Sequence, residues 1–168
     1  MRFALTMRRA AALFLPLLFA AVPTQARDSL GVFGQWGAFR DPTGPRCYAI
    51  TQPVVRAGSR PRGFAAVGTW PRQKIRGQIH FRLSRPRRAD APVLLKVGDR
   101  RFTLVAGQMD AWAPDARTDA QVIAAMRSAT GMSVATVGSD GRGFADSYTL
   151  RGAATAIDAA ALGCARLR

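Results

Sequence analysis

Two cysteines and a single histidine are the residues of this chain with the most obvious chemical potential. A cysteine nucleophile needs a neighbouring base to remove the thiol proton, so an enzyme of this kind would use Cys47, His80 or both. His80 falls on the polar side of an alternating segment beside Arg82, and nearby cations do nothing to orient it as a base. A small enzyme of unrecognised type therefore remains an alternative rather than the leading hypothesis.

Other reactive patterns are weak. The two cysteines are far apart, and the chain has no CxxC, HExxH or paired-histidine spacing of the kind that binds zinc. Asp110, Asp115 and Asp119 are irregularly spaced for a calcium loop, and Asp119 is better explained as a residue of the first turn of a helix. The glycine clusters do not have the spacing of a phosphate loop. We therefore predict no catalytic residue, no metal site and no cofactor.

The first 26 residues have the layout of a secretory signal peptide. A basic start with Arg2, Arg8 and Arg9 precedes an apolar run over 10–22, and small residues precede a cleavage point after Ala26. The apolar run is shorter than the roughly 20 residues that a spanning helix needs. The sequence thus predicts a periplasmic or secreted protein that does not span a membrane, with one β-rich domain over 27–168.

This predicted compartment bears on the cysteines. Disulfides form and persist in oxidising compartments, and an even number of cysteines favours pairing. We therefore predict a bond between Cys47, in an early strand, and Cys164, near the C-terminus. Two buried free thiols remain the alternative.

Positive charge is concentrated in one part of the chain. The formal net charge is +15, all acidic residues are aspartate, and none lies between Asp41 and Asp90. A basic surface attracts polyanions, and an exported protein rarely meets nucleic acid, so the predicted partner is an anionic envelope component or an acidic protein. Four candidate anion-binding residues lie toward the end of this segment: Arg82, Arg85, Arg87 and Arg88. A solvated basic face without a dedicated ligand, or a base-composition bias of the gene, would explain the same pattern.

Short apolar or alternating runs predict about eight strands. In 78–84, Ile79, Phe81 and Leu83 alternate with polar residues, which is typical of a half-buried strand. Gly98-Asp99 predicts a hairpin turn between two further runs. The strands are expected within 30–39, 47–52, 63–70, 78–84, 93–97, 101–105, 132–137 and 144–150, and 109–113 is a candidate for one more short strand. Trp36, Trp70 and Trp112 fall in such segments and are expected in the core.

Two helices complete the expected pattern. The segment 118–131 begins with a capping box, Thr118-x-x-Gln121, and Gly131 is expected to end the helix. The alanine-rich 152–166 suits a terminal helix that stops at Gly163. The fold class is therefore mainly β, an antiparallel β-sandwich or open barrel with one inserted helix and a short C-terminal helix.

Motifs at the two ends of the mature chain point to a family resemblance. Gly34-x-Trp36 is followed by a cysteine-containing strand over 47–53, and 147–162 reads as a closing strand, a glycine turn and a short amphipathic segment. In these features the chain resembles the invasion-associated locus B family of exported bacterial proteins. The resemblance implies a small periplasmic or secreted β-rich protein without known catalytic residues. A role in host-cell invasion is not carried over, because fold does not transmit function.

This chain departs from the family in its cysteines. Family members usually carry a further cysteine shortly after the tryptophan, near the place of Arg40, and a mid-chain pair that is missing here. The leading hypothesis is a non-enzymatic cell-envelope protein that engages an anionic surface or an acidic partner through its arginine-rich segment. A periplasmic small-molecule carrier is a further alternative. The oligomeric state is not determined by the sequence.

Overall fold

The structure is a computed structural model that describes residues 27–55, 58 and 62–165, so the predicted signal peptide lies outside the described residues. Short β-branched, aromatic and alanine runs separated by glycine or polar turns form the strands. The strands are β1 Asp28–Phe33, β2 Trp36–Asp41, β3 Arg46–Thr51, β4 Phe64–Trp70, β5 Ile75–Arg82, β6 Val93–Val97, β7 Arg100–Ala106, β8 Asp110–Trp112, β9 Gly131–Val137 and β10 Gly143–Thr149. A 3₁₀ turn, η1 Pro71–Gln73, links β4 to β5, and the helices are α1 Ala116–Ser128 and α2 Ala153–Cys164.

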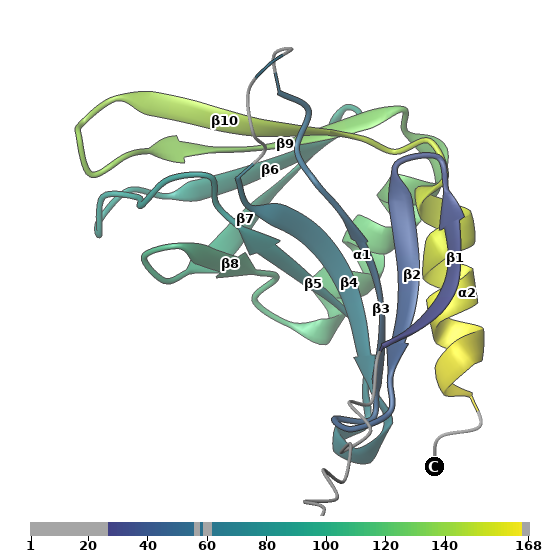
Figure 1. Cartoon of the computed structure of the whole chain (residues 1–168). Helices are drawn as coiled ribbons and strands as arrows, with labels where there is room; N and C mark the ends of the chain where they lie inside the picture. The colour runs from purple at the N-terminus through teal and green to yellow at the C-terminus, as the bar shows by residue number, and fades with distance from the viewer. Residues whose placement is uncertain (1–26, 56–57, 59–61, 166–168) are drawn as a thin grey trace, which may run out of the picture.

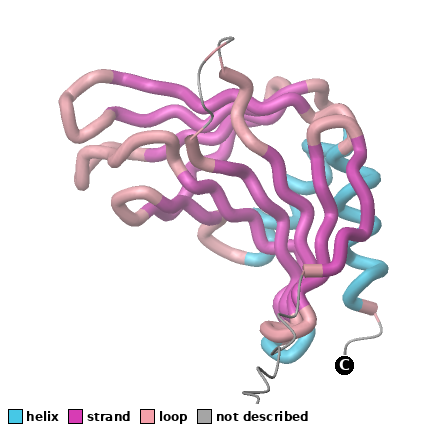
Figure 2. Tube along the Cα trace, viewed as in Figure 1, coloured by secondary structure: helices cyan, strands magenta, loops and turns pink. Residues whose placement is uncertain are grey.

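All ten described strands belong to one antiparallel sheet, in the order β1-β2-β3-β4-β5-β8-β7-β6-β9-β10. The sheet is strongly curved but does not close into a barrel in the described part of the chain (Figure 1). Helix α2 packs on β1 to β4, and α1 packs on β5 and touches α2 (Figure 2). The predicted class, mainly β and antiparallel with one inserted and one C-terminal helix, is confirmed.

The curvature brings distant segments together. The backbone N–H of Val54, just after β3, donates to the carbonyl oxygen of Ser147 in β10 at 2.7 Å. The indole Nε1 of Trp36 donates to the carbonyl oxygen of Thr149 at 2.9 Å, so this fully buried ring is hydrogen-bonded as well as packed. The first bond joins exposed segments at the surface, whereas Trp36 belongs to the core that both helices and the curved sheet share.

Strand β5 confirms the predicted alternation. Ile79, Phe81 and the following Leu83 are each 1% exposed and face the core. His80 and Arg82 lie on the outer face, which the helices do not cover. The prediction for the tryptophans was right for Trp36 alone, since Trp70 and Trp112 are only half-buried and belong to this outer face. A two-residue period does not distinguish a core aromatic from one on the other side of the same sheet.

The expected single strand over 30–39 is in fact a hairpin of β1 and β2. Phe33 pairs with Trp36, so Gly34 and Gln35 form the turn. Gly34 has a φ of 61°, and a Cβ there would run into the carbonyl of Arg151. The turn therefore requires glycine for both its backbone conformation and its close contact with the start of α2.

The bounds of α1 differ from the prediction at both ends. Its N-cap is Asp115, whose carboxylate accepts from the N–H of Thr118 at 2.7 Å, so Thr118 lies inside the first turn. Aspartate is a stronger N-cap than threonine, which explains why the helix begins earlier than the capping box predicted. Gly131 does not end the helix, because the chain is already extended at Ala129 and Gly131 begins β9.

Gly163 does not stop the terminal helix either. It lies within α2, which continues to Cys164. A Cβ on Gly163 would lie 2.5 Å from Cδ1 of Leu30, so the missing side chain lets the helix approach β1. The sequence predicts that Gly163 ends the helix, but the structure shows that a glycine is needed there for close packing against β1.

Candidate functional site

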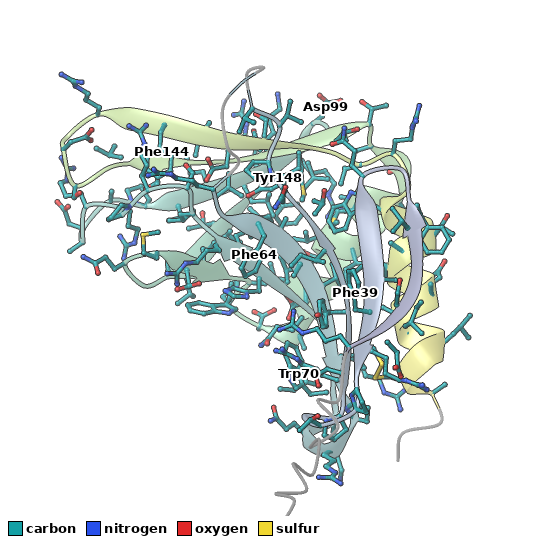
Figure 3. All side chains as sticks on the ribbon, in the orientation of Figure 1. Phe39, Phe64, Trp70, Asp99, Phe144 and Tyr148 are labelled. Atoms are coloured by element: carbon teal, nitrogen blue, oxygen red, sulfur yellow. A yellow bond between two sulfur atoms is a disulfide. The ribbon has the colours of Figure 1, made fainter. Side chains whose placement is uncertain are left out.

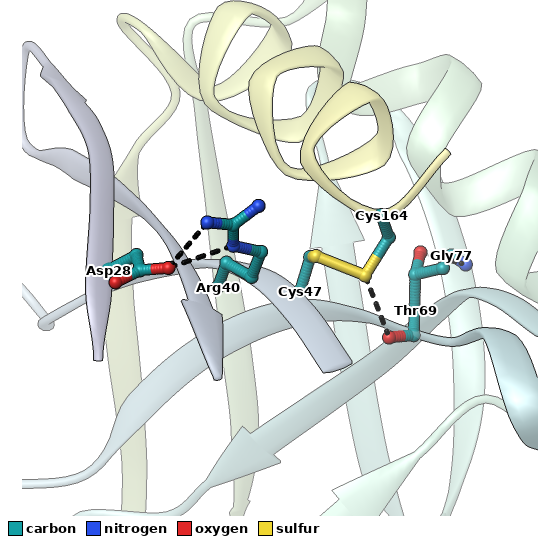
Figure 4. Close-up of a disulfide and its surroundings, with 6 residues drawn as sticks. All are labelled: Asp28, Arg40, Cys47, Thr69, Gly77 and Cys164. Carbon is teal, nitrogen blue, oxygen red and sulfur yellow. Dashed lines mark hydrogen bonds and ion pairs between the residues drawn. A yellow bond between two sulfur atoms is a disulfide. The ribbon is translucent and has the colours of Figure 1, made fainter. Parts of the chain in front are cut away.

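Cys47 and Cys164 form a disulfide, as the sequence predicted. Cys47 is on β3 and Cys164 ends α2, with Cα atoms 5.7 Å apart at a sequence separation of 117 residues. Both are buried, and Sγ of Cys164 lies 4.0 Å from the carbonyl oxygen of Thr69 on β4 (Figure 4). The bond fixes the end of the helix to the sheet, and neither sulfur is a free thiol in this structure.

The disulfide bears directly on the enzyme hypothesis. In the β3–β4–β5 register, His80 pairs with Ala66 and Ala66 with Ile50, so these three side chains share the outer face. Cys47 is an odd number of residues from Ile50 along β3 and points to the opposite, helix-covered face. The fold therefore does not assemble Cys47 and His80 into a nucleophile–base pair.

His80 nevertheless contacts a carboxylate and two aromatic rings, which the sequence did not predict. Its Nε2 lies 2.9 Å from Oδ1 of Asp110, and its ring stacks on Trp112 at 5.2 Å between centroids. The ring of Phe64 forms a T-shaped contact with the imidazole, with 5.1 Å between centroids. Asp110 orients the imidazole and also pairs with Arg82 at 2.6 Å. The register of β5 with the three-residue β8 makes this cluster, and no local sequence signal pairs the two segments.

Asp110, Asp115 and Asp119, the candidates for a calcium loop, have separate structural roles. Asp110 pairs with His80 and Asp115 caps α1. Asp119 is buried, and its Oδ1 accepts a hydrogen bond from the backbone N–H of Ile79 at 2.8 Å. Pairing between β5 and β8 ends at His80, so this carboxylate serves the next residue of β5. Burial raises the pKa of Asp119, partly offset by that hydrogen bond. Within residues 27–55 and 62–165, no three potential ligands cluster around a common point.

Most of the predicted anion-binding arginines have internal partners. Arg82 pairs with Asp110 at 2.6 Å, and Arg88 pairs with Asp90 at 2.7 Å. Arg85 lies 3.7 Å from Asp140 and stacks over Phe144, whose ring Figure 3 labels on β10. Each of these charges is thus partly neutralised where it lies, and their role in anion binding stays a prediction.

Arg87 has a structural environment of a different kind. Its guanidinium donates to five main-chain carbonyl oxygens at 2.6 to 2.9 Å, those of Arg88, Ala89, Ala91, Ala106 and Gly107. Nε and Nη2 each donate one of these bonds, and the two N–H groups of Nη1 are shared among the other three oxygens. The side chain therefore joins the loop after β5 to the end of β7, and most of its donors are engaged by the main chain.

Unpaired positive charge is concentrated instead at the turn between β4 and β5. Arg72, Lys74 and Arg76 are exposed and, in the described part of the chain, have no carboxylate within ion-pair distance. We call these three residues the basic turn. Pro71 suits the first position of the 3₁₀ turn, and Lys74 closes it in a left-handed conformation with φ of 57°. The turn extends beyond Trp70 at the lower end of the sheet in Figure 3.

Both described helices are short. Helix α1 has 13 residues and α2 has 12, and neither has the length and apolar character needed to cross a membrane. No protein-family model matches the chain, and no curated protein matches it.

A search of solved structures does find a similar fold. The crystal structure of invasion associated protein B from Bartonella henselae matches with a TM-score of 0.60 at 17% sequence identity. The match covers 79% of this chain and 96% of the other. At this identity the likeness establishes a shared fold and carries no residue role. The resemblance inferred from the two ends of the sequence is thus confirmed at the level of the fold.

Proposed function

We propose that this chain is a non-enzymatic protein of the cell envelope that binds anionic lipid surfaces through its basic turn. The observation that carries the proposal is the concentration of three exposed cations without carboxylate partners at Arg72, Lys74 and Arg76. Export is supported by the signal-like segment over 1–26 and by the disulfide, which an oxidising compartment maintains.

The geometry favours this turn over the arginines that the sequence singled out. An arginine that is already ion-paired with a carboxylate contributes less free energy to the binding of a second anion, because the new contact competes with the existing pair. Arg87 already donates to five main-chain carbonyl oxygens, so its guanidinium is held in place by the protein itself. Arg72, Lys74 and Arg76 have no such competing contact to lose, so their charge is available to a ligand.

The absence of an assembled nucleophile supports a binding role over an enzymatic one. The thiol that an enzyme would need is consumed in the Cys47–Cys164 bond. His80 has an orienting aspartate, yet Asp110 also neutralises Arg82, and both rings that flank the histidine pack against it as structural neighbours.

Vesicle binding tests the proposal. Vesicles of phosphatidylglycerol and phosphatidylcholine would be compared with pure phosphatidylcholine by co-sedimentation at low and high salt. Each basic residue near an anionic surface contributes about 1 kcal/mol, so the triple variant R72Q/K74Q/R76Q should bind about a hundredfold more weakly. Binding by the unchanged protein should weaken as salt rises.

A matched variant controls for total charge. Arg101, Arg117 and Arg142 are also exposed and have no carboxylate within ion-pair distance among the residues that the structure describes, and R101Q/R117Q/R142Q removes the same charge elsewhere. It should retain most of the binding. An equal loss in both triple variants would indicate a diffuse effect of net charge and contradict a site at the basic turn. Binding only to an acidic protein, with none to vesicles, would contradict the choice of a lipid surface.

A further inference from the structure

A groove of about 870 Å³ lies between the two helices and the sheet, directly beside the basic turn. Its lining comes from β4, the turn, the start of β5, α1 and the last turns of α2. Thr69 and Gly77 belong to its sheet side and Cys164 to the end of α2, and Figure 4 shows the three residues near the disulfide. This volume is in the range of pockets that enclose small ligands.

Small side chains explain why the groove is open. The face of α2 that lines it carries Ala160, Ala161 and Ala165, which leave space that larger residues would fill. Gly77 has a different role, because it adopts a φ of 71° and a Cβ there would lie 2.8 Å from Cδ1 of Ile123, so the missing side chain lets β5 approach α1 closely at one side of the groove. Folded proteins normally fill the space between helices and sheet with side chains, so an open groove of this size is consistent with a binding site for a ligand.

The walls and the rim of the groove have different chemistry. Val67, Ile123 and Ile157 give the walls an apolar surface. Lys74 and Arg76 line the same groove, and no acidic residue does. Arg127, also in the lining, is held by Asp158 of α2 through two hydrogen bonds of 2.6 and 3.1 Å. Available positive charge therefore comes from the basic turn, next to apolar surface.

We propose that this groove binds a single alkyl chain with an anionic head, either a carboxylate or a phosphate. The chain lies against the apolar walls, and the head is held by Lys74 and Arg76. Charge complementarity identifies the head, because the groove has unpaired cations and no carboxylate. The inference deepens the proposed function and rests on it, since the same turn would recognise anionic lipid and seat one of its chains.

Calorimetric titration with simple amphiphiles tests the chain and the head separately. The probes are decanoate, dodecanoate, dodecyl phosphate and uncharged dodecanol, each below its aggregation threshold. Affinity should rise about fourfold for each added methylene, because each buries further apolar surface. Dodecanol should bind about tenfold more weakly than the two charged dodecyl probes, since it cannot pair with the cations. A preference between dodecanoate and dodecyl phosphate distinguishes a fatty acid from a lipid phosphate.

Ala161 offers a way to fill the groove without disturbing the core. It is exposed and lines the groove, so Ala161→Trp should place an indole in the space and reduce dodecanoate affinity at least tenfold. The matched control is Leu162→Trp, because Leu162 is 73% exposed and is not part of the lining. Circular dichroism and urea unfolding should show that both variants remain folded.

The outcomes separate the inference from the proposed function. Affinity independent of chain length, or unchanged in Ala161→Trp, would overturn the groove even if R72Q/K74Q/R76Q still lost vesicle binding. A protein whose vesicle binding did not depend on the basic turn would overturn the proposed function and this inference with it. A dimeric mass in light scattering, with no probe bound, would show the groove covered by a second copy and would also refute it.

Discussion

Replacing both Cys47 and Cys164 with alanine is expected to lower the free energy of unfolding by about 4.9 kcal/mol. The bond closes a loop with a sequence separation of 117 residues, and the chain-entropy relation converts this length into that value at 25 °C. Most of the effect arises in the unfolded chain, which regains the freedom that the cross-link removes. A domain of this size is stable by only about 5 to 15 kcal/mol, so the loss would be large.

The structure also suggests where the loss would be felt first. Helix α2 is attached to the sheet by Ala153, Ala156, Ile157 and Ala160, and mostly small side chains bury little surface. Without the bond, the helix end near Cys164 should exchange its amide hydrogens faster than the central strands. Local opening and global unfolding can thus be distinguished by hydrogen exchange.

Urea unfolding of the two proteins is the primary assay. The alanine variant should have a lower midpoint and a larger m-value, because its unfolded chain is less compact. Reduction of the unchanged protein should give a similar loss. A loss below about 1 kcal/mol with an unchanged m-value would refute the loop-entropy reasoning and indicate that packing alone holds the helix.

Three further predictions follow from single contacts. Arg87→Gln should cost about 2 to 3 kcal/mol in urea unfolding, because several main-chain carbonyls lose a charged donor, whereas the exposed neighbour variant Arg88→Gln should change stability by less than about 0.5 kcal/mol. Asp119→Ala should cost about 1 to 3 kcal/mol by leaving the N–H of Ile79 without a partner, and equal stability of the two proteins would contradict this role. The hydrogen bond from Arg127 on α1 lowers the pKa of Asp158. The pair therefore stabilises the folded protein fully above the ordinary carboxylate pKa of 3.8, and this contribution is lost as the pH falls through the lowered pKa. The difference in urea midpoint between the unchanged protein and Asp158→Asn should therefore shrink in acid, and a difference independent of pH would count against the pair.

Local patterns were sufficient for much of the fold. The alternation around Ile79 and Phe81 identifies strand β5 and its buried face, because side chains on a strand point alternately to its two sides. The Gly98-Asp99 turn predicts the hairpin of β6 and β7, which the structure confirms. Helix ends were less predictable, since Asp115 competed successfully with Thr118 as the N-cap.

The candidate site depended on contacts that no local pattern contains. A run of arginines predicted positive surface at Arg82, Arg85, Arg87 and Arg88, yet each has a partner. That of Arg88 is the nearby Asp90, whereas those of Arg82 and Arg85 are brought close by the fold. The partner of Arg82 is 28 residues away and is placed by the register between β5 and β8. The basic turn could have been singled out only by knowing which cations remain unpaired.

The sequence by itself determined the class of secondary structure, the alternating burial of the strands and the pairing of the only two cysteines. These depend on local periodicity, and on a count that leaves one partner for each thiol. Strand order, the opposite faces of Cys47 and His80, the ion pairs of Arg82 and Arg85 and the groove beside the basic turn were decided by tertiary structure alone. Their physical reason is that charge pairing and open volume depend on distances between segments far apart in the chain, which folding sets and local sequence does not.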